Sequence, residues 1–135
     1  AQDTLLICPP VVSQRAALGA LQAGPNYCLN YVKDMGDVRH LCLERLSELG
    51  ERCRVPETRG AFYLLARIET RLTALQLVER LVREHRVAAI PGEAFGLDGE
   101  CYLRIAFGAL RQDTVAEGMD RLINGLQHII DDNIA

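Results

Sequence analysis

Apolar residues recur along this chain with two different periods, which divide it into helical and extended segments. A period of three to four residues predicts helices over four ranges: 14–23, 27–49, 74–85 and 114–132. Short apolar runs predict extended segments over four others: 52–56, 62–68, 87–90 and 101–108. This order predicts an α+β fold, in which a small mixed β-sheet is covered by helices on one face, with a long amphipathic helix and a C-terminal helix.

Polar residues at the predicted helix starts indicate where three of the helices begin. Ser13 is predicted to cap the first helix with its hydroxyl group. Thr73 with Gln76, and Thr114 with Glu117, each have the spacing of a capping box, in which two side chains bind the free backbone N–H groups of a helix start.

The segment 101–108 carries an arginine at a position where a charge is out of place. Successive strand residues face opposite sides of a sheet, so one face is predicted to be core: Cys101, Leu103, Ile105 and Phe107. Arg104 lies on the other face among a tyrosine and two small residues, which leaves space above its guanidinium group. A guanidinium fork binds a carboxylate through two parallel hydrogen bonds, so Arg104 is a candidate carboxylate ligand. In the alternative interpretation, Arg104 is an edge residue paired with a surface Asp or Glu.

Composition and charge narrow the class of protein. The chain has 135 residues, nearly half of them hydrophobic, and is predicted to form a single domain over residues 1–135. A net charge of -3, with arginines scattered among acidic residues, argues against nucleic acid as a partner. No apolar run approaches the length of a membrane span, so no membrane partner is predicted.

The cysteines and histidines show no spacing typical of a metal site. The five cysteines are odd in number and widely separated, which predicts buried free thiols and a cytoplasmic location: Cys8, Cys28, Cys42, Cys53 and Cys101. His85 falls on the apolar stripe of its helix, and a packed, hydrogen-bonded histidine is predicted there in preference to a catalytic one.

Three stretches of the chain, in register, resemble the class I/II aminotransferases, the pyridoxal-phosphate enzymes of the aspartate aminotransferase superfamily (fold type I). They are Ser13-Gln14-Arg15-Ala16-Ala17-Leu18, Gly60-Ala61-Phe62-Tyr63, and Pro91-Gly92-Glu93-Ala94-Phe95-Gly96 followed by Tyr102-Leu103-Arg104-Ile105. The resemblance spans essentially the whole chain. It implies the C-terminal small domain of an enzyme that transfers an amino group between an amino acid and a 2-oxo acid.

The resemblance also implies roles for particular residues. Arg104 would bind the α-carboxylate of the substrate, while Gly60, Ala61 and Phe95 would border the side-chain pocket. The cofactor pyridoxal 5'-phosphate would be bound by the large domain, which is absent here, as is the lysine that forms the Schiff base with it. Lys33 is the one lysine of the sequence and has none of that lysine's context, so it is interpreted as a surface charge. No catalytic, cofactor-binding or metal-binding residue is predicted in the chain, which is expected to be inactive alone.

Further expectations follow from the same resemblance. The chain begins at Ala1 without an initiator methionine, so it is expected to be a piece of a larger protein, with the Schiff-base lysine before Ala1. The parent enzyme is expected to be a homodimer, because fold type I enzymes usually build each active site across a subunit interface. The glycine-rich loop 92–99 is a candidate hinge or lid.

Three alternatives remain open from the sequence. The parent could be a pyridoxal-phosphate lyase of the same superfamily, since the same arginine would serve it. The chain could instead be a non-catalytic module that holds a carboxylate through Arg104. It could also be a structural or dimerisation module, with the helix over 14–23, rich in small residues, as its interface.

Overall fold

The computed structural model describes residues 8–108 and 111–132, apart from the side chain of residue 30. The chain separates into two compact units, Ala1–Asp34 and Met35–Ala135. Helix α3 (Asn26–Ser47) contributes its first part to one unit and its second part to the other. The single domain proposed over residues 1–135 stays a prediction.

The first unit contains helix α2 (Val11–Ala23) and the beginning of α3. Every residue of α2 is exposed, and no residue described in this unit is buried. The prediction that Ser13 caps this helix is wrong, because the helix begins two residues earlier. Pro10 occupies the N-cap position, and its carbonyl oxygen accepts a hydrogen bond from the backbone nitrogen of Gln14 at 3.1 Å. Proline suits such a start because it has no N–H group to satisfy.

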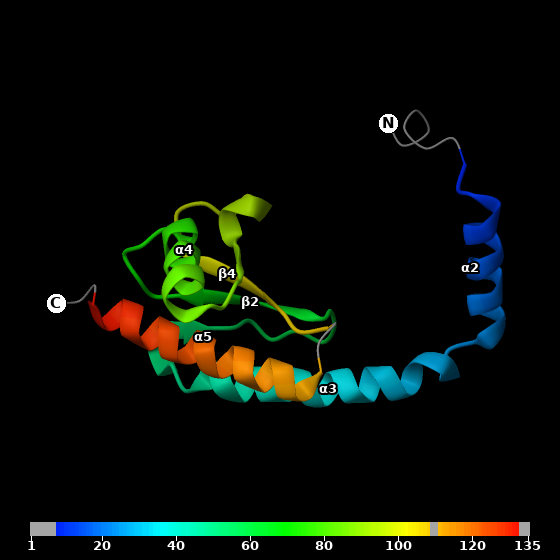
Figure 1. Cartoon of the computed structure of the whole chain (residues 1–135), viewed down its shortest axis with the longest axis horizontal. Helices are drawn as coiled ribbons and strands as arrows, with labels where there is room; N and C mark the ends of the chain where they lie inside the picture. The colour runs from blue at the N-terminus through cyan, green and yellow to red at the C-terminus, as the bar shows by residue number, and fades with distance from the viewer. Residues whose placement is uncertain (1–7, 109–110, 133–135) are drawn as a thin grey trace. The chain divides into compact units, whose positions relative to one another are not determined.

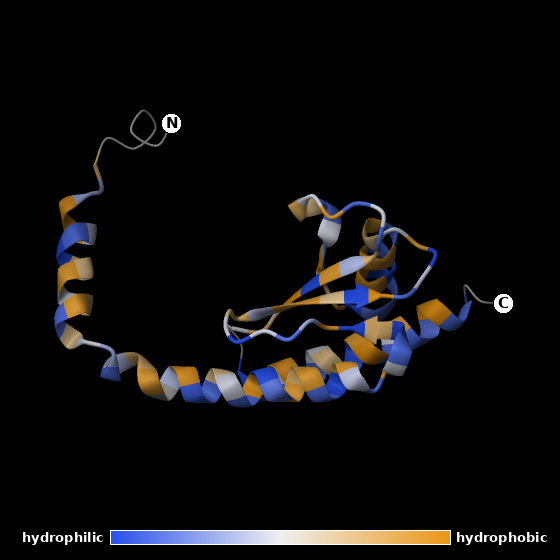
Figure 2. Ribbon diagram, turned by 180° about the vertical axis from the view of Figure 1, so that it is seen from behind, coloured by the Kyte–Doolittle hydropathy of each residue, from blue (hydrophilic) through white to orange (hydrophobic). Residues whose placement is uncertain are grey.

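The helices of the described part of the chain do not have the character of membrane spans. In Figure 2, apolar and polar residues alternate along α2 and α3. No described helix combines the length and the apolar character that crossing a membrane requires.

The second unit is built on a four-stranded sheet. Its strands are β1 (Cys53–Arg54), β2 (Tyr63–Ile68), β3 (Ile90–Pro91) and β4 (Tyr102–Ala106). They lie in the order β1-β2-β4-β3, and all three pairings are antiparallel. The predicted α+β class is confirmed, although the sheet is wholly antiparallel where a mixed sheet was expected. Of the predicted extended segment 87–90, only Ile90 belongs to a strand, because β3 consists of the two edge residues Ile90–Pro91, and Ile90 is 41% exposed.

Helices cover one face of this sheet. They are the second part of α3 with α4 (Ala74–His85) and α5 (Gln112–Asp132). The unit also contains two short 3-10 helices, η1 (Gly50–Arg52) and η2 (Gly92–Phe95). Residues of α3, α4 and α5 form one buried hydrophobic cluster with Leu64, Ala66 and Leu103 of the sheet. Figure 1 shows α4 and α5 gathered against β2 and β4. Helical cover on one face is as predicted, and none of the α-helices described in this unit packs on the opposite face.

The two predicted capping boxes have different outcomes. At α4 the box is confirmed, because the Thr73 hydroxyl accepts from the Gln76 backbone nitrogen at 3.2 Å and the Gln76 side chain accepts from the Thr73 backbone nitrogen at 3.0 Å. At α5 the prediction is wrong. This helix begins at Gln112, so Thr114 lies inside its first turn, where its backbone nitrogen donates to the carboxylate of Asp113 at 2.7 Å.

Replacing Thr73 with alanine is therefore expected to lower the free energy of unfolding by about 1 kcal/mol, because the cap of α4 is lost. The same replacement of Thr114, which caps no helix, is the matched control and is expected to have a smaller effect. Urea unfolding of both variants followed by circular dichroism measures the difference. Equal losses would show that the box at Thr73 contributes nothing specific.

Candidate functional site

Strand β4 has the two faces that its sequence predicts. Its odd-numbered neighbours are all buried, namely Cys101, Leu103, Ile105 and Phe107. On the other face, Tyr102 and Arg104 are half-buried, and Ala106 is exposed. Arg104 therefore lies on the face of the sheet that the helices do not cover, which we call the open face.

The pairing of the strands determines what surrounds Arg104. Leu65 of β2 is directly opposite it on one side, and Ile90 of β3 on the other. Two aromatic rings flank its guanidinium carbon, which lies 4.2 Å from the ring centroid of Tyr63 and 5.1 Å from that of Phe95. Aromatic rings attract a cation through their negative faces, so these contacts hold the guanidinium in place while leaving its N–H donors unpaired.

Arg104 has no acidic partner among the described residues, and its Nε atom is buried without a hydrogen-bond partner. The contrast with Arg67, on the same open face, is direct, since Arg67 pairs with Glu100 at 2.8 Å and with Glu69 at 3.6 Å. The edge interpretation, in which Arg104 pairs with a surface acid, is therefore wrong for the described residues. A buried donor without a partner is costly in a folded protein, and an anion in front of it would relieve that cost.

The other residues predicted to line the site lie at two places. Phe95 ends η2 and contacts Arg104, so the structure brings these two together. Gly60 and Ala61 are exposed and precede β2, and Ala61 has a left-handed backbone with φ of 65°. Their place in a side-chain pocket stays a prediction.

Sequence reasoning assigned no role to Tyr63, which has the shorter contact with Arg104. Burial alternates along β2, with Leu64, Ala66 and Ile68 inside. The same alternation, applied to β2, would have placed Tyr63 on the open face. Only the register of β2 against β4 then brings it to Arg104.

The residues around Arg104 suit a carboxylate better than a cofactor. Lys33, the one lysine of the sequence, is exposed and belongs to the first unit, so the unit that holds Arg104 contains no lysine of its own. A hollow of about 340 Å³ lies beside the start of β4, but Arg104 is absent from its lining, which comes from residues 67–73 and 99–101. The open face itself is therefore the candidate site.

The loop 92–99 is attached to α4 by its acidic residue. Glu93 accepts hydrogen bonds through Oε1 from the backbone nitrogens of Ala74 and Leu75, at 3.1 and 3.4 Å. A carboxylate is favoured at a helix N-terminus, where backbone N–H groups are free. The link fixes the part of the loop that carries Phe95.

The loop begins with Gly92 because Tyr102 leaves no space there for a side chain. A Cβ atom built on Gly92 would lie 2.7 Å from Cβ of Tyr102 and 3.2 Å from the Tyr102 carbonyl oxygen. Replacing Gly92 with alanine is expected to destabilise the fold by about 1–3 kcal/mol through this clash. Replacing Gly60 with alanine, where nothing lies within 4 Å, is the matched control and is expected to change little. Thermal unfolding of the two variants measures the difference in stability. A Gly92→Ala variant as stable as the parent would contradict the close packing of Gly92 against Tyr102.

The cysteine and histidine predictions hold only in part. Cys42 and Cys101 are buried, and burial raises the pKa of their thiols to about 11 and about 12. Cys8 and Cys28 are exposed, so the prediction of buried thiols is wrong for them. His85 is packed as predicted, but its Nε2 atom is buried without a hydrogen-bond partner.

A comparison with known protein families shows to which family the chain belongs. A family model described as aminotransferase class I and II matches residues 2–122. The chain belongs to the class I and II aminotransferase family.

Known aminotransferases match most of the chain. It is 34% identical over 130 residues to the aromatic aminotransferase ISS1 of Arabidopsis thaliana, which covers 96% of the chain and 32% of that protein. It is 36% identical over 118 residues to an aspartate aminotransferase of Pyrococcus abyssi, covering 85% of the chain and 30% of that enzyme. The chain thus spans about a third of the length of these relatives.

A solved structure agrees with the fold. LysN, an α-aminoadipate aminotransferase of Thermus thermophilus, superposes with a TM-score of 0.82 at 23% identity, over 96% of the chain and 34% of that structure. The small antiparallel sheet with its helices is therefore a fold found in an aminotransferase.

Proposed function

We propose that this chain is the C-terminal small domain of a pyridoxal-phosphate-dependent aminotransferase and that Arg104 binds the α-carboxylate of its amino-acid and 2-oxo-acid substrates. The observation that carries the proposal is the guanidinium on the open face, flanked by Tyr63 and Phe95 and without an acidic partner among the described residues. Membership of the family supports the reaction class.

The role of Arg104 is to bind and orient. Its fork of N–H groups donates two parallel hydrogen bonds to a carboxylate, which fixes both the position and the rotation of the substrate. The rings of Tyr63 and Phe95 restrict the guanidinium, so less freedom is lost when the substrate binds. Pyridoxal phosphate, bound by the rest of the enzyme, would supply the electron-withdrawing chemistry of amino transfer. Correct orientation of the substrate makes that chemistry fast.

The test is to produce the chain together with the sequence that we propose precedes Ala1. That longer protein is expected to bind pyridoxal phosphate, with its visible absorbance, and to convert an amino acid and a 2-oxo acid into the exchanged pair. Elimination products without amino exchange would indicate a lyase instead. A purified longer protein that binds no pyridoxal phosphate would contradict the proposal, as would a natural start at Ala1.

We further propose that the enzyme is a cytoplasmic homodimer. All five cysteines are free in the structure, which suits a reducing compartment. The dimer is proposed by analogy with fold type I enzymes. Light scattering of the longer protein would measure twice the mass of one chain, and a monomeric mass would contradict the analogy.

The loop that carries Phe95 is proposed to act as a hinge near the substrate. Glu93 anchors its beginning, while Gly96 and Gly99 have φ values of 76° and 89° that favour glycine. We expect the amide groups of residues 96–99 to exchange with solvent faster than those of β4. Protection equal to that of β4 would contradict a hinge here.

A further inference from the structure

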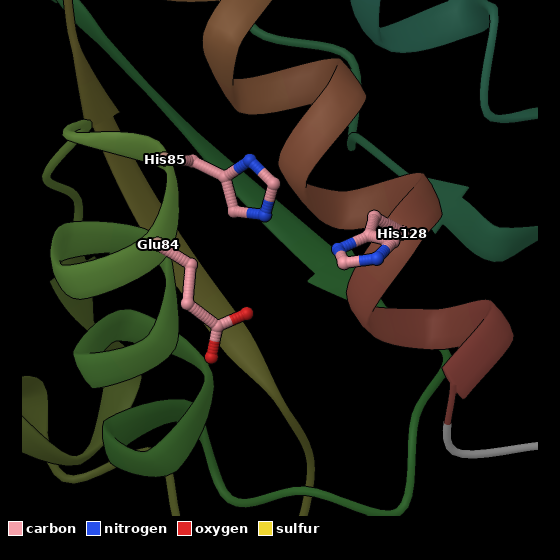
Figure 3. A group of neighbouring side chains, drawn as sticks. All are labelled: Glu84, His85 and His128. Atoms are coloured by element: carbon pink, nitrogen blue, oxygen red, sulfur yellow. The ribbon is translucent and has the colours of Figure 1, made fainter.

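The ends of α4 and α5 bring together three side chains that the proposed substrate site does not use. Glu84 and His85 are the last two residues of α4, and His128 lies near the end of α5. In Figure 3 all three project into the space between these helices. One ligand atom from each, a carboxylate oxygen or a ring nitrogen, lies within 4.8 Å of the others.

Close packing of the two helices positions the histidines. A Cβ atom built on Gly125 of α5 would lie 2.9 Å from Cγ of His85 and 2.9 Å from Cδ2 of Leu81. A larger residue there would force the side chains of His85 and Leu81 to shift. The rings of His85 and His128 meet with centroids 5.6 Å apart and an interplanar angle of 72°. The pair is thus set by the helix packing and not only by flexible surface side chains.

His85 offers a ring nitrogen that nothing in the described structure satisfies. Its Nε2 atom is buried and has no hydrogen-bond partner. A neutral imidazole carries a lone pair on one of its two nitrogens, so a ring nitrogen without a hydrogen-bond partner can act as a ligand for a metal ion. This atom is the observation that points to a ligand, beyond the mere proximity of the three residues.

The charges around the cluster also suit a cation. Glu84 accepts hydrogen bonds from Arg80 at 2.7 and 2.9 Å, so its carboxylate is held in an ion pair at the end of α4. Asp132 lies 3.9 Å from Nε2 of His128 and is itself paired with Arg80 at 3.1 Å. Arg80 balances one of the two carboxylates, so one negative charge is left to attract a metal ion.

We propose that Glu84, His85 and His128 form a binding site for a divalent transition-metal ion, with zinc as the best match, that joins the ends of α4 and α5. Two imidazoles and one carboxylate are ligands that zinc prefers, whereas calcium and magnesium prefer oxygen alone. Tetrahedral ligands at zinc distances stand about 3.4 Å apart, so small side-chain rotations from the present separations suffice. A water molecule would complete the coordination.

The first experiment is a calorimetric titration of the 135-residue chain with zinc chloride. In a second, separate experiment the metal-free chain is titrated with cobalt chloride, and visible absorbance is the readout. Exposed thiols also bind zinc, so Cys8 and Cys28 are first replaced by serine. One ion per chain is expected to bind. His128→Ala and Glu84→Gln are each expected to weaken zinc binding at least ten-fold. Cobalt is expected to give the visible bands of a four-coordinate site without a thiolate charge-transfer band.

The matched control is His40→Ala. His40 also faces a carboxylate one turn away, Glu44 at 3.2 Å. Among the described residues, however, His40 and Glu44 have no third metal-ligating side chain close to them. This variant is expected to bind zinc as tightly as the parent. The His128 side chain is 61% exposed, so its removal should leave the circular dichroism spectrum unchanged.

Several results would overturn the proposal. They are the absence of zinc binding, equal binding by the parent and both ligand variants, and a strong thiolate band that assigns the metal to the remaining cysteines. If His128→Ala fails to fold, Glu84→Gln decides alone, because its replacement keeps the shape of the side chain. None of these outcomes depends on whether Arg104 binds a carboxylate.

Discussion

Replacing Arg104 with alanine in the proposed longer enzyme is expected to weaken binding of the amino-acid substrate by about 2–3 kcal/mol, which is roughly 30- to 150-fold in the dissociation constant. The physical reason is the loss of a two-bond charged contact on the open face, where Arg104 has no competing acid among the described residues. The change is measured by titrating the enzyme with amino acid and following the absorbance of the bound cofactor.

Two further variants make this result specific. Arg104→Lys keeps the positive charge but loses the planar fork, so it is expected to recover only part of the affinity. Arg67→Ala removes a neighbouring arginine of the same face that is already paired with Glu100, and it is expected to leave substrate affinity nearly unchanged. Equal losses from Arg67→Ala and Arg104→Ala would mean that general charge, and not a specific contact, attracts the substrate.

The second large effect is expected in the core behind the site. Leu77 of α4 is 0% exposed, and Leu77→Ala is expected to cost about 2–5 kcal/mol of unfolding free energy, because it removes packed atoms and leaves a cavity. Leu75, two residues earlier on the same helix, is 54% exposed, and Leu75→Ala should change stability by about 0.5 kcal/mol or less.

Urea unfolding of the 135-residue chain measures both leucine variants, and the comparison uses the midpoints at a common slope. Because the two substitutions are chemically identical and lie on one helix, differences in helix propensity cancel. A loss for Leu75→Ala as large as that for Leu77→Ala would contradict the assignment of the core face of α4.

The parts of the fold that could be predicted are those that local patterns determine. Alternation along 101–108 placed Arg104 opposite a buried face, and the structure has this arrangement. The apolar stripe of the last helix is likewise buried throughout: Val115, Met119, Leu122, Ile123, Leu126, Ile129 and Ile130. A period of 2.0 or 3.6 residues carries this information because each element buries one side.

The parts that could not be predicted depend on contacts between distant residues. Whether the sheet is mixed or antiparallel depends on how β3 and β4 follow α4, and no local pattern encodes that path. The contact of Tyr63 with Arg104 joins residues 41 positions apart and needs the register of β2 on β4. The predicted starts of α2 and α5 were wrong for a different reason. The backbone carbonyl of Pro10 or Arg111 accepts the first hydrogen bond of the helix, which therefore begins before the nearest Ser or Thr.

The most direct measurement compares an amino acid with the amine that lacks only its carboxylate, in the longer enzyme and in its Arg104→Ala variant. If Arg104 binds the carboxylate, the enzyme prefers the amino acid strongly, and the variant loses most of that preference while binding the amine as before. A variant that keeps the full preference for the amino acid would show that the carboxylate is bound elsewhere.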